Sequence, residues 1–394
     1  MGLKSSMRAV VLDVYRMTLR PAFLYVAERW IVYRKIACKG SQIPSGNGYG
    51  GFRQLAGYEP IDVSKPRFML DEKLQVRQLK DFLENPNLRP YVAGVLSADG
   101  VVVAYPSMAH SWRGKVFLEA LLDDIKNFVQ PKFIRDVLRI RFSSAKAMPE
   151  AVMLALPQHT NYYHWMTELL PRLMMVDSDA HLRTLPLLVP RNGTPAFVLN
   201  SLKLTGYSDR VKLMDDGLYS FERLHIPTLL SPPSHPSPIA VEWLRKKLLR
   251  TTNDDATPEK RIYVSRRDAG TRYATNEAAV EQCLQSHGFE TVVMNGLSLE
   301  QQIETFRSAR IIVGLHGAAM TNLIFAKSGG FVLELFLEGW FTNSFYHLSL
   351  IRKLNYGFLV CRKDGDGQYV DVEKLEALVT MVLAEASPDP VTVQ

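Results

Sequence analysis

Cysteine is scarce in this chain of 394 residues. The three that occur are Cys38, Cys283 and Cys361, and they stand far apart. An odd number without metal-site spacing argues against a disulfide framework and against a zinc site made of thiolates. Thiols left unpaired are typical of a reducing cytosol. We therefore expect a cytoplasmic protein, and no glycan on the sequon that begins at Asn192.

Long hydrophobic runs are missing as well. No stretch of 18 uncharged apolar residues occurs, whereas a membrane-spanning helix needs about 20. The N-terminal apolar runs are broken by charges and lack a small-residue cleavage site, so they do not have the form of a secretory signal. The charges are Arg8, Asp13, Arg16 and Arg20. With 47% apolar and 22% charged residues, the chain has the composition of a soluble globular protein and the length of two domains.

Several catalytic motifs are also absent. The chain has no Gly-x-Ser-x-Gly elbow, no Walker loop and no His-Glu-x-x-His pair, and no Gly-x-Gly-x-x-Gly follows a predicted strand. These absences argue against the corresponding hydrolases, NTPases and dehydrogenases. Nothing in the sequence requires a metal. The acidic stretch 177–179 follows a helical pattern and is interpreted as a helix-end turn, and 364–367 as a surface turn.

Positive charge is abundant, and part of it is local. The net charge is +7, and residues 1–40 carry eight Lys or Arg against Asp13 and Glu28, together with Trp30 and several tyrosine and phenylalanine rings. Such a segment can lie on an anionic membrane surface, or it can form a solvated helix packed on its own protein. No nucleic-acid motif accompanies the charge, so we expect no nucleic-acid partner.

The predicted elements fall on either side of a stiff connector at 231–238, where four of eight residues are proline. Before it we predict a glycine-rich loop at 41–60, two strands joined at Asp99-Gly100 within 91–105, strands at 151–157, 185–189 and 224–227, and a helix at 195–204. After it we predict helices at 238–250, 276–287 and 299–309. Asn276 caps the second of these helices and Ser298 caps the third. We predict strands at 261–265, 290–294, 311–313 and 331–336. Strand–helix alternation predicts a parallel sheet covered on both faces.

The most informative stretch runs from 310 to 325. A short apolar strand ends in a glycine turn at Gly314 and Gly317, and Ala318 then starts a helix. Helix first-turn amides lack partners within the helix, and the helix dipole favours an anion there. His316, Thr321 and Asn322 add hydrogen-bonding groups. The stretch is thus either a cradle for a diphosphate or an ordinary strand-to-helix turn with a satisfied His316.

Three further side chains fit the diphosphate interpretation. Arg266 and Arg267 follow the strand 261–265 at the edge where open α/β sheets bind ligands, and guanidinium groups suit phosphate oxygens. Solvated surface charge is the alternative. Glu334 interrupts an apolar strand, and a buried carboxylate needs a partner. That partner is either a ribose or an internal arginine.

A second stretch, 161–173, combines a helix start with a candidate base. Asn161 is a suitable N-cap, and His164 and Glu168 lie four residues apart, on one helix face. A carboxylate beside an imidazole favours the proton-accepting role of a general base. The alternative is structural, with Tyr163 and its apolar neighbours packing and His164 only bridging. We predict that Asn161 and Tyr163 lie on the acceptor side.

Taken together, the patterns resemble glycosyltransferase family 61. Three blocks carry the resemblance: Asn161-Tyr-Tyr-His-Trp-Met-Thr-Glu-Leu-Leu-Pro-Arg-Leu173, Tyr263-Val-Ser-Arg-Arg-Asp268, and Ile312-Val-Gly-Leu-His-Gly-Ala-Ala-Met-Thr-Asn-Leu-Ile-Phe325 followed by Val332-Leu-Glu-Leu335. Leu315 stands where the family often has proline, and 328–330 where Pro-Gly is common. The first 140 residues show no feature of the family.

The resemblance implies an α/β protein of GT-B type, with two Rossmann-like domains facing across a cleft. We expect a basic segment and loop at 1–60, an acceptor-side domain at 61–235 and a nucleotide-sugar-binding domain at 236–394. The implied activity is inverting transfer from a nucleotide sugar to a hydroxyl of a glycan or lipid-linked glycan, without metal or cofactor. Bacterial members act in capsule or exopolysaccharide synthesis, which suits a cytoplasmic enzyme at the inner membrane. The alternative is a non-catalytic scaffold of a polysaccharide assembly with a degenerate nucleotide site.

Overall fold

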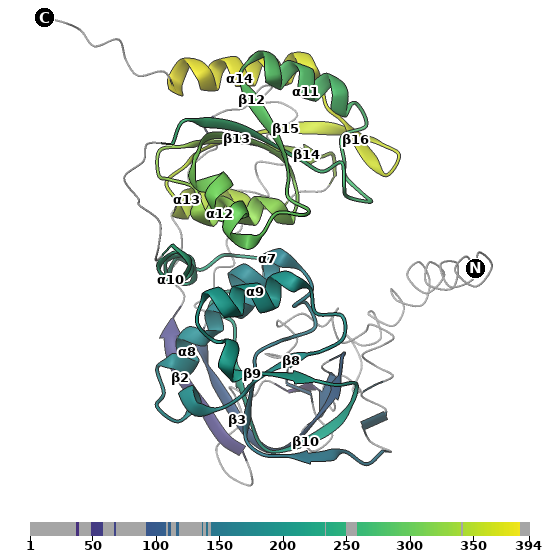
Figure 1. The fold of residues 1–394 in the computed structure, drawn as a ribbon, viewed down its shortest axis with the longest axis vertical. Coiled ribbons are helices and arrows are strands. Elements are labelled where there is room, and N and C mark those ends of the chain that lie inside the picture. The colour runs from purple at the N-terminus through teal and green to yellow at the C-terminus, as the bar shows by residue number, and fades with distance from the viewer. Residues whose placement is uncertain are drawn as a thin grey trace, which may run out of the picture.

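The computed structural model of the chain describes residues 37–38, 49–57, 67, 92–107, 109–111, 116–117, 136, 139–140, 143–232, 234–249, 258–339 and 342–386. The basic segment predicted at 1–40 lies outside these ranges, apart from residues 37–38. None of the described helices combines the length and apolarity that crossing a bilayer requires. The described chain is mixed α/β, with two large sheets joined through the helix α10 (Pro238–Leu248) (Figure 1).

The second sheet is parallel except at one edge. Its order is β12-β11-β13-β14-β15-β16, and only β16 runs antiparallel to its neighbour. The strands are β11 (Lys260–Ser265), β12 (Phe289–Val293), β13 (Ala309–Leu315), β14 (Phe331–Leu337), β15 (Asn355–Asp364) and β16 (Gly367–Tyr369). The chain passes from β11 outward to β12 and then returns to the other side of β11 as β13. The strand order therefore reverses between β11 and β13, the position where open α/β sheets bind ligands.

Helices cover both faces of this sheet, as predicted. They are α11 (Glu277–Ser286), α12 (Leu299–Arg307), the 3-10 helix η8 (Ala318–Phe325), α13 (Ser344–Ile351) and α14 (Val372–Ala386). Successive strand residues point to opposite sides, so Tyr263 and Val313 join one buried apolar cluster while Ile262 and Ile312 join another. Figure 1 shows α11 and α14 on the outer face, and α12 and α13 on the face toward the first half of the chain.

The first sheet is mixed. Its order is β2-β3-β10-β7-β8-β9, with β4 beside β3 and β6 beside β10. The strands are β2 (Tyr49–Gly57), β3 (Val92–Tyr105), β4 (Ala109–Ser111), β6 (Lys146–Met148), β7 (Ala151–Met153), β8 (Leu187–Pro190), β9 (Val211–Met214) and β10 (Gly217–Pro227). A separate pair joins β1 (Ala37–Cys38) and β5 (Val116–Phe117). Strands β10, β7, β8 and β9 are parallel, whereas β2 and β3 are antiparallel to their neighbours. Only part of this half therefore has the parallel pattern of a Rossmann-like domain.

Two predictions for the first half are wrong. Residues 91–105 do not form a hairpin at Asp99-Gly100, because β3 is one continuous strand that pairs with β10 from Tyr105 back to Val95. Gly100, with φ 71°, makes a local irregularity there instead of a turn. The predicted loop at 41–60 contains β2, which pairs with the other edge of β3. In both cases a distant strand supplies hydrogen bonds that outweigh the local turn signal.

The helix predicted after Asn161 is present but irregular. It passes from α7 (Tyr162–His164) through a π-helical turn, η4 (Trp165–Leu169), and a 3-10 turn, η5 (Leu170–Arg172), into α8 (Leu173–Asp177). Asn161 caps it as predicted, since Oδ1 accepts from the amide of Tyr163 at 2.9 Å. The helix-end turn predicted at 177–179 is confirmed.

The remaining elements match the predictions within a few residues, with two local differences. The Ser298 capping box opens α12 as predicted, whereas Asn276 does not cap α11 with its side chain. That side chain instead bonds the backbone of Val370 through both its amide atoms. The helix after Gly317 is a 3-10 helix. The domain boundaries at 61–235 and 236–394 stay a prediction.

Candidate active site

His164, the last residue of α7, forms a hydrogen-bonded pair with Glu168 of the π-helical turn. Nδ1 of His164 lies 2.8 Å from Oε2 of Glu168. The other carboxylate oxygen accepts the amide of Ser234 at 2.7 Å, so both oxygens of this buried side chain have partners. Since the carboxylate accepts, Nδ1 carries the hydrogen and Nε2 is left as an acceptor. The side chain of His164 is 23% exposed, so its reactive nitrogen is reachable.

The electrostatics of this pair suit a general base. Burial acts to lower the pKa of His164, but the hydrogen bond and the charge of Glu168 outweigh burial and raise the pKa above its ordinary value. An imidazole that holds a proton more tightly is a stronger acceptor in the transition state. The π-helical turn places the pair, and such turns are frequent at functional sites.

Arg266 and Gly317 meet at the switch point between β11 and β13. A Cβ added at Gly317 would lie 2.7 Å from Cζ of Arg266 and closer still to Nη1. The φ of Gly317 is 175°, an extended conformation open to any residue, so the only obstacle to a larger residue among the nearest atoms is the side chain of Arg266. The guanidinium group thus lies against the glycine turn, as expected for two parts of one anion site.

Arg266 has one buried nitrogen without a hydrogen-bond partner in the described part of the chain, and a second arginine lies nearby. Its Nε is buried and has no hydrogen-bond partner among the described residues, while Nη2 donates to the carbonyl of Thr271 at 3.2 Å. Burial and the nearby charge of Arg272 lower the pKa of Arg266, with Asp268 acting in the opposite direction. Two guanidinium groups held close together are stabilised by a bound anion. Sequence reasoning missed Arg272, because nothing in its local pattern separates it from surface charge.

Arg267 points to a different partner. It forms an ion pair with Glu281 of α11, and its amide donates to Oγ of Ser265 at 3.2 Å. Its side chain is 49% exposed. Of the two arginines predicted to bind the donor, the structure places only Arg266 against Gly317.

His316 and Glu334 form a second histidine–carboxylate pair. Nδ1 of His316 lies 2.5 Å from Oε1 of the fully buried Glu334, and Tyr356 donates its hydroxyl hydrogen to Oε2 at 2.5 Å. The internal partners of this carboxylate are therefore His316 and Tyr356 and not an arginine, and a contact with a ribose stays a prediction. The ring of His316 stacks on Phe336 at 5.1 Å. Held through Nδ1, His316 is oriented with Nε2 available to a ligand.

The residues that follow Gly317 differ in whether their polar groups already have partners within the protein. The amide of Met320 donates to the carbonyl of Gly317 and closes the first 3-10 turn, which Ala318 begins. Oγ1 of Thr321 is buried without a hydrogen-bond partner among the described residues. Asn322 is fully buried, accepts from the hydroxyl of Tyr162 at 2.7 Å and donates to Gln302 at 3.2 Å. Its hydrogen bonds therefore join α7 of the first half to η8 of the second.

Aromatic rings connect the two histidine pairs. Tyr163 packs edge-on against His164 at 5.5 Å and against Phe345 of α13 at 5.7 Å. Phe345 in turn lies 5.1 Å from His316. Two rings in succession thus separate the candidate base from the candidate anion site, which come from opposite halves of the chain. Asn161 lies at the start of the same helix but uses its side chain as a cap.

One family of known proteins is similar to this region of the chain. Residues 162–333 match the family model described as Glycosyltransferase 61, and no curated protein matches. Among solved structures, a mutant flavo di-iron protein from Thermotoga maritima aligns with a TM-score of 0.27 and 11% identity over 48% of this chain and 49% of that one. The chain spans about half the length of that structure, and so low a score carries no argument. The family match covers the His164, Arg266 and His316 segments, so this part of the chain is similar to glycosyltransferase family 61.

Proposed function

We propose that the protein is an inverting glycosyltransferase that moves a sugar from a nucleotide-sugar donor to a hydroxyl of a glycan acceptor. The observation that supports this proposal most strongly is that a candidate general base lies near a candidate anion site. A histidine–carboxylate pair, His164 with Glu168, is separated by two aromatic rings from a cationic turn formed by Arg266, Gly317 and His316. A displacement at an anomeric carbon needs a proton acceptor on one side and a site for the leaving diphosphate on the other.

In the proposed reaction, Nε2 of His164 accepts the proton of the acceptor hydroxyl. The acceptor oxygen forms a bond to the anomeric carbon while the bond from that carbon to the diphosphate oxygen breaks, and the bonding electrons leave with the diphosphate. Glu168 stabilises the imidazolium that forms. Arg266, Arg272 and His316 stabilise the charge that develops on the diphosphate, where removing one donor typically costs about 10²–10³ in rate. We propose that Thr321 adds a hydroxyl donor and that Arg267 contributes charge at longer range.

The composition of the chain and its family resemblance support a bacterial setting. We infer a glycan or lipid-linked glycan of capsule, exopolysaccharide or lipopolysaccharide as the acceptor, and a cytoplasmic enzyme that meets the inner membrane through the basic residues 1–40. The groups named above supply the acid–base and electrostatic roles, so we propose that transfer needs neither a metal nor a cofactor.

A panel of nucleotide sugars tests the proposal. Donor binding is measured by the rise in unfolding temperature, since a ligand of the folded state stabilises it by mass action. Release of nucleoside diphosphate is then measured with oligosaccharide acceptors, with and without EDTA, and the anomeric configuration of the product is determined by NMR. Transfer with inversion in EDTA is the expected result. A protein that binds no nucleotide sugar would instead be the non-catalytic scaffold, and retention of configuration would exclude the single displacement.

A further inference from the structure

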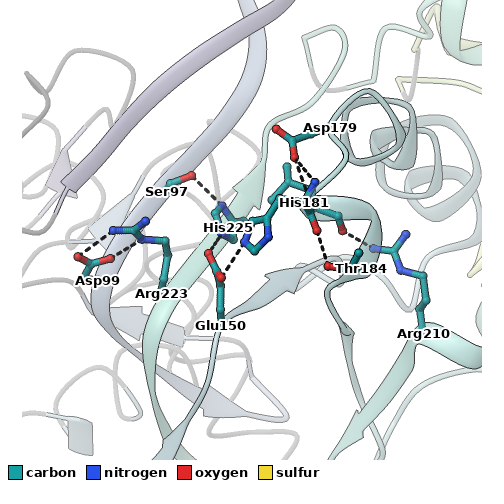
Figure 2. Close-up of polar contacts among 10 residues, drawn as sticks. Ser97, Asp99, Glu150, Asp179, His181, Thr184, Arg210, Arg223 and His225 are labelled. Atoms are coloured by element: carbon teal, nitrogen blue, oxygen red, sulfur yellow. Dashed lines mark hydrogen bonds and ion pairs between the residues drawn. The ribbon is translucent and has the colours of Figure 1, made fainter.

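A second polar cluster lies in the first half of the chain, built from Glu150, His181 and His225. Oε1 of Glu150 is 2.7 Å from Nε2 of His225, and Oε2 is 2.8 Å from Nε2 of His181 (Figure 2). The candidate ligand atoms of the three side chains all lie within 4.8 Å of one another. Within the described part of the chain this is the one such group of histidine, cysteine and acidic residues.

The three side chains come from three separate segments. Glu150 immediately precedes β7, His181 lies in the turn between α8 and the 3-10 helix η6 (Leu182–Thr184), and His225 belongs to β10. No sequence spacing links them, which is why the sequence predicts no metal site here. Two imidazoles and a carboxylate are the ligands of many zinc sites, and tetrahedral ligands stand about 3.3 Å apart. The two separations from Glu150 need to open by about half an ångström to admit such an ion, and the two histidine nitrogens lie within 4.8 Å of each other.

Further contacts hold the side chain of His225 and the backbone around His181 in place. Nδ1 of His225 lies 2.7 Å from Oγ of Ser97 on β3. The backbone around His181 is held by Asp179, whose Oδ1 accepts the amides of His181 and Leu182 at 2.8 and 2.9 Å, and by Thr184, which donates to the carbonyl of His181 (Figure 2). Metal-binding histidines almost always bond a second group through the other ring nitrogen.

Ser97 is chemically suited to both states of this cluster. Without a metal, Nε2–H of His225 donates to Glu150, so Nδ1 accepts from the Ser97 hydroxyl. With Nε2 on a metal, Nδ1 carries the hydrogen and donates to the same oxygen. A hydroxyl serves in either direction.

We propose that Glu150, His181 and His225 bind one divalent transition-metal ion, with Zn²⁺ the preferred occupant, and that the ion stabilises the first half of the protein. Imidazole nitrogen with one carboxylate suits Zn²⁺ and its transition-metal neighbours better than Mg²⁺ or Ca²⁺. The side chain of His225 is 7% exposed and that of His181 is 59% exposed, so an ion enters from the His181 side and water completes its coordination.

The position of the site assigns it a structural role. Glu150 stands at the amino end of β7, whereas the chain leaves the carboxyl end of that strand to reach His164. The ion therefore lies at the opposite end of the strand from the candidate base. It ties β10 to the turn before β7 and to the turn after α8, three segments that the hydrogen bonds of Glu150 already join here.

Zinc binding by the full chain tests the proposal. The protein is stripped with a chelator, and Zn²⁺ affinity is measured in competition with a chromophoric chelator, with Co²⁺ absorption as a report of coordination geometry. We expect one site per chain, a higher unfolding temperature with Zn²⁺, and Co²⁺ bands of a tetrahedral site. His181→Ala should abolish all three without unfolding the protein, because that side chain is largely exposed.

Three further variants make the test decisive. Glu150→Gln should also abolish binding, and Ser97→Ala should weaken it by about 10- to 100-fold, as loss of such a supporting hydrogen bond does. His287→Ala, which removes a histidine on the second half, should bind like wild type. A wild-type protein without a stoichiometric site, or equal affinity in wild type and His181→Ala, would overturn the proposal and leave a purely hydrogen-bonded triad. None of these measurements depends on sugar transfer.

Discussion

The guanidinium group of Arg266 lies against the backbone of Gly317, so closely that a methyl group at position 317 would displace it. One residue follows β11 and the other follows β13, and the reversal of strand order between them creates the contact. The anion site is therefore a product of sheet topology as much as of residue type.

Gly317→Ala should weaken nucleotide-sugar binding by at least about tenfold, an effect of the size expected when a charged hydrogen bond is misplaced. The added Cβ meets the far end of a flexible side chain, so Arg266 moves aside and stability changes little. Isothermal titration calorimetry measures the affinity, and thermal unfolding measures the stability. Gly270→Ala is the matched control, because a Cβ there meets nothing within 4 Å. Equal donor affinity in both variants would contradict the assigned role of Arg266.

Substitutions of the two histidines should separate chemistry from binding. His164→Ala should abolish transfer while donor affinity stays near that of wild type, because in the proposed reaction His164 accepts the proton of the acceptor hydroxyl and does not bind the diphosphate. His316→Ala should weaken donor affinity as well as transfer. Single-turnover transfer and equilibrium donor binding, measured for both variants, provide the comparison. Wild-type transfer by His164→Ala would remove that residue from the mechanism.

The acid side of the pH–rate profile should depend on Glu168. The base must be unprotonated, so the rate falls as the pH drops through the pKa of His164. Because Glu168 raises that pKa, the acid limb of kcat/KM should lie above pH 6.5 in the wild type. Glu168→Gln removes the charge, so the limb should move to lower pH and the maximal rate should fall. Glu281→Gln, which removes the partner of Arg267, should leave the limb in place. An unmoved limb in Glu168→Gln would show that another group is the base.

Acid should destabilise the protein through His347. Burial, helped by the charge of the nearby His235, lowers the pKa of His347 from 6.5 to about 4. The unfolded chain then binds a proton between these values that the folded protein does not, so this stability is complete above pH 6.5 and is lost as the pH falls toward 4. The loss amounts to about 3 kcal/mol.

His347→Leu should therefore flatten the pH dependence of stability between pH 6.5 and 4 while changing stability little at pH 7. Both ring nitrogens of His347 are buried without hydrogen bonds among the described residues, so leucine loses no polar contact. Urea unfolding at several pH values measures the effect. A variant that keeps the full acid dependence would assign it to other groups.

Local pattern was sufficient for the parts of this protein that neighbouring residues determine. The four-residue spacing of His164 and Glu168 predicts one helix face, and the two side chains are hydrogen-bonded even though the turn is π-helical. The apolar runs at 311–313 and 331–336 predict buried parallel strands, and the capping box at Ser298 predicts the start of α12. Each of these features depends on contacts within one or two turns or on burial of a short run.

Contacts between distant segments needed the folded chain. Pairing with β10 turned the expected hairpin at Asp99-Gly100 into one long strand, and pairing with β3 made a strand of an expected loop. The placement of Arg272 beside Arg266, the bond from Tyr162 to Asn322 and the cluster at Glu150 have the same origin. These contacts are made by groups that meet only after the sheets have formed. The order of strands in a sheet cannot be predicted from the periodicity of any single segment.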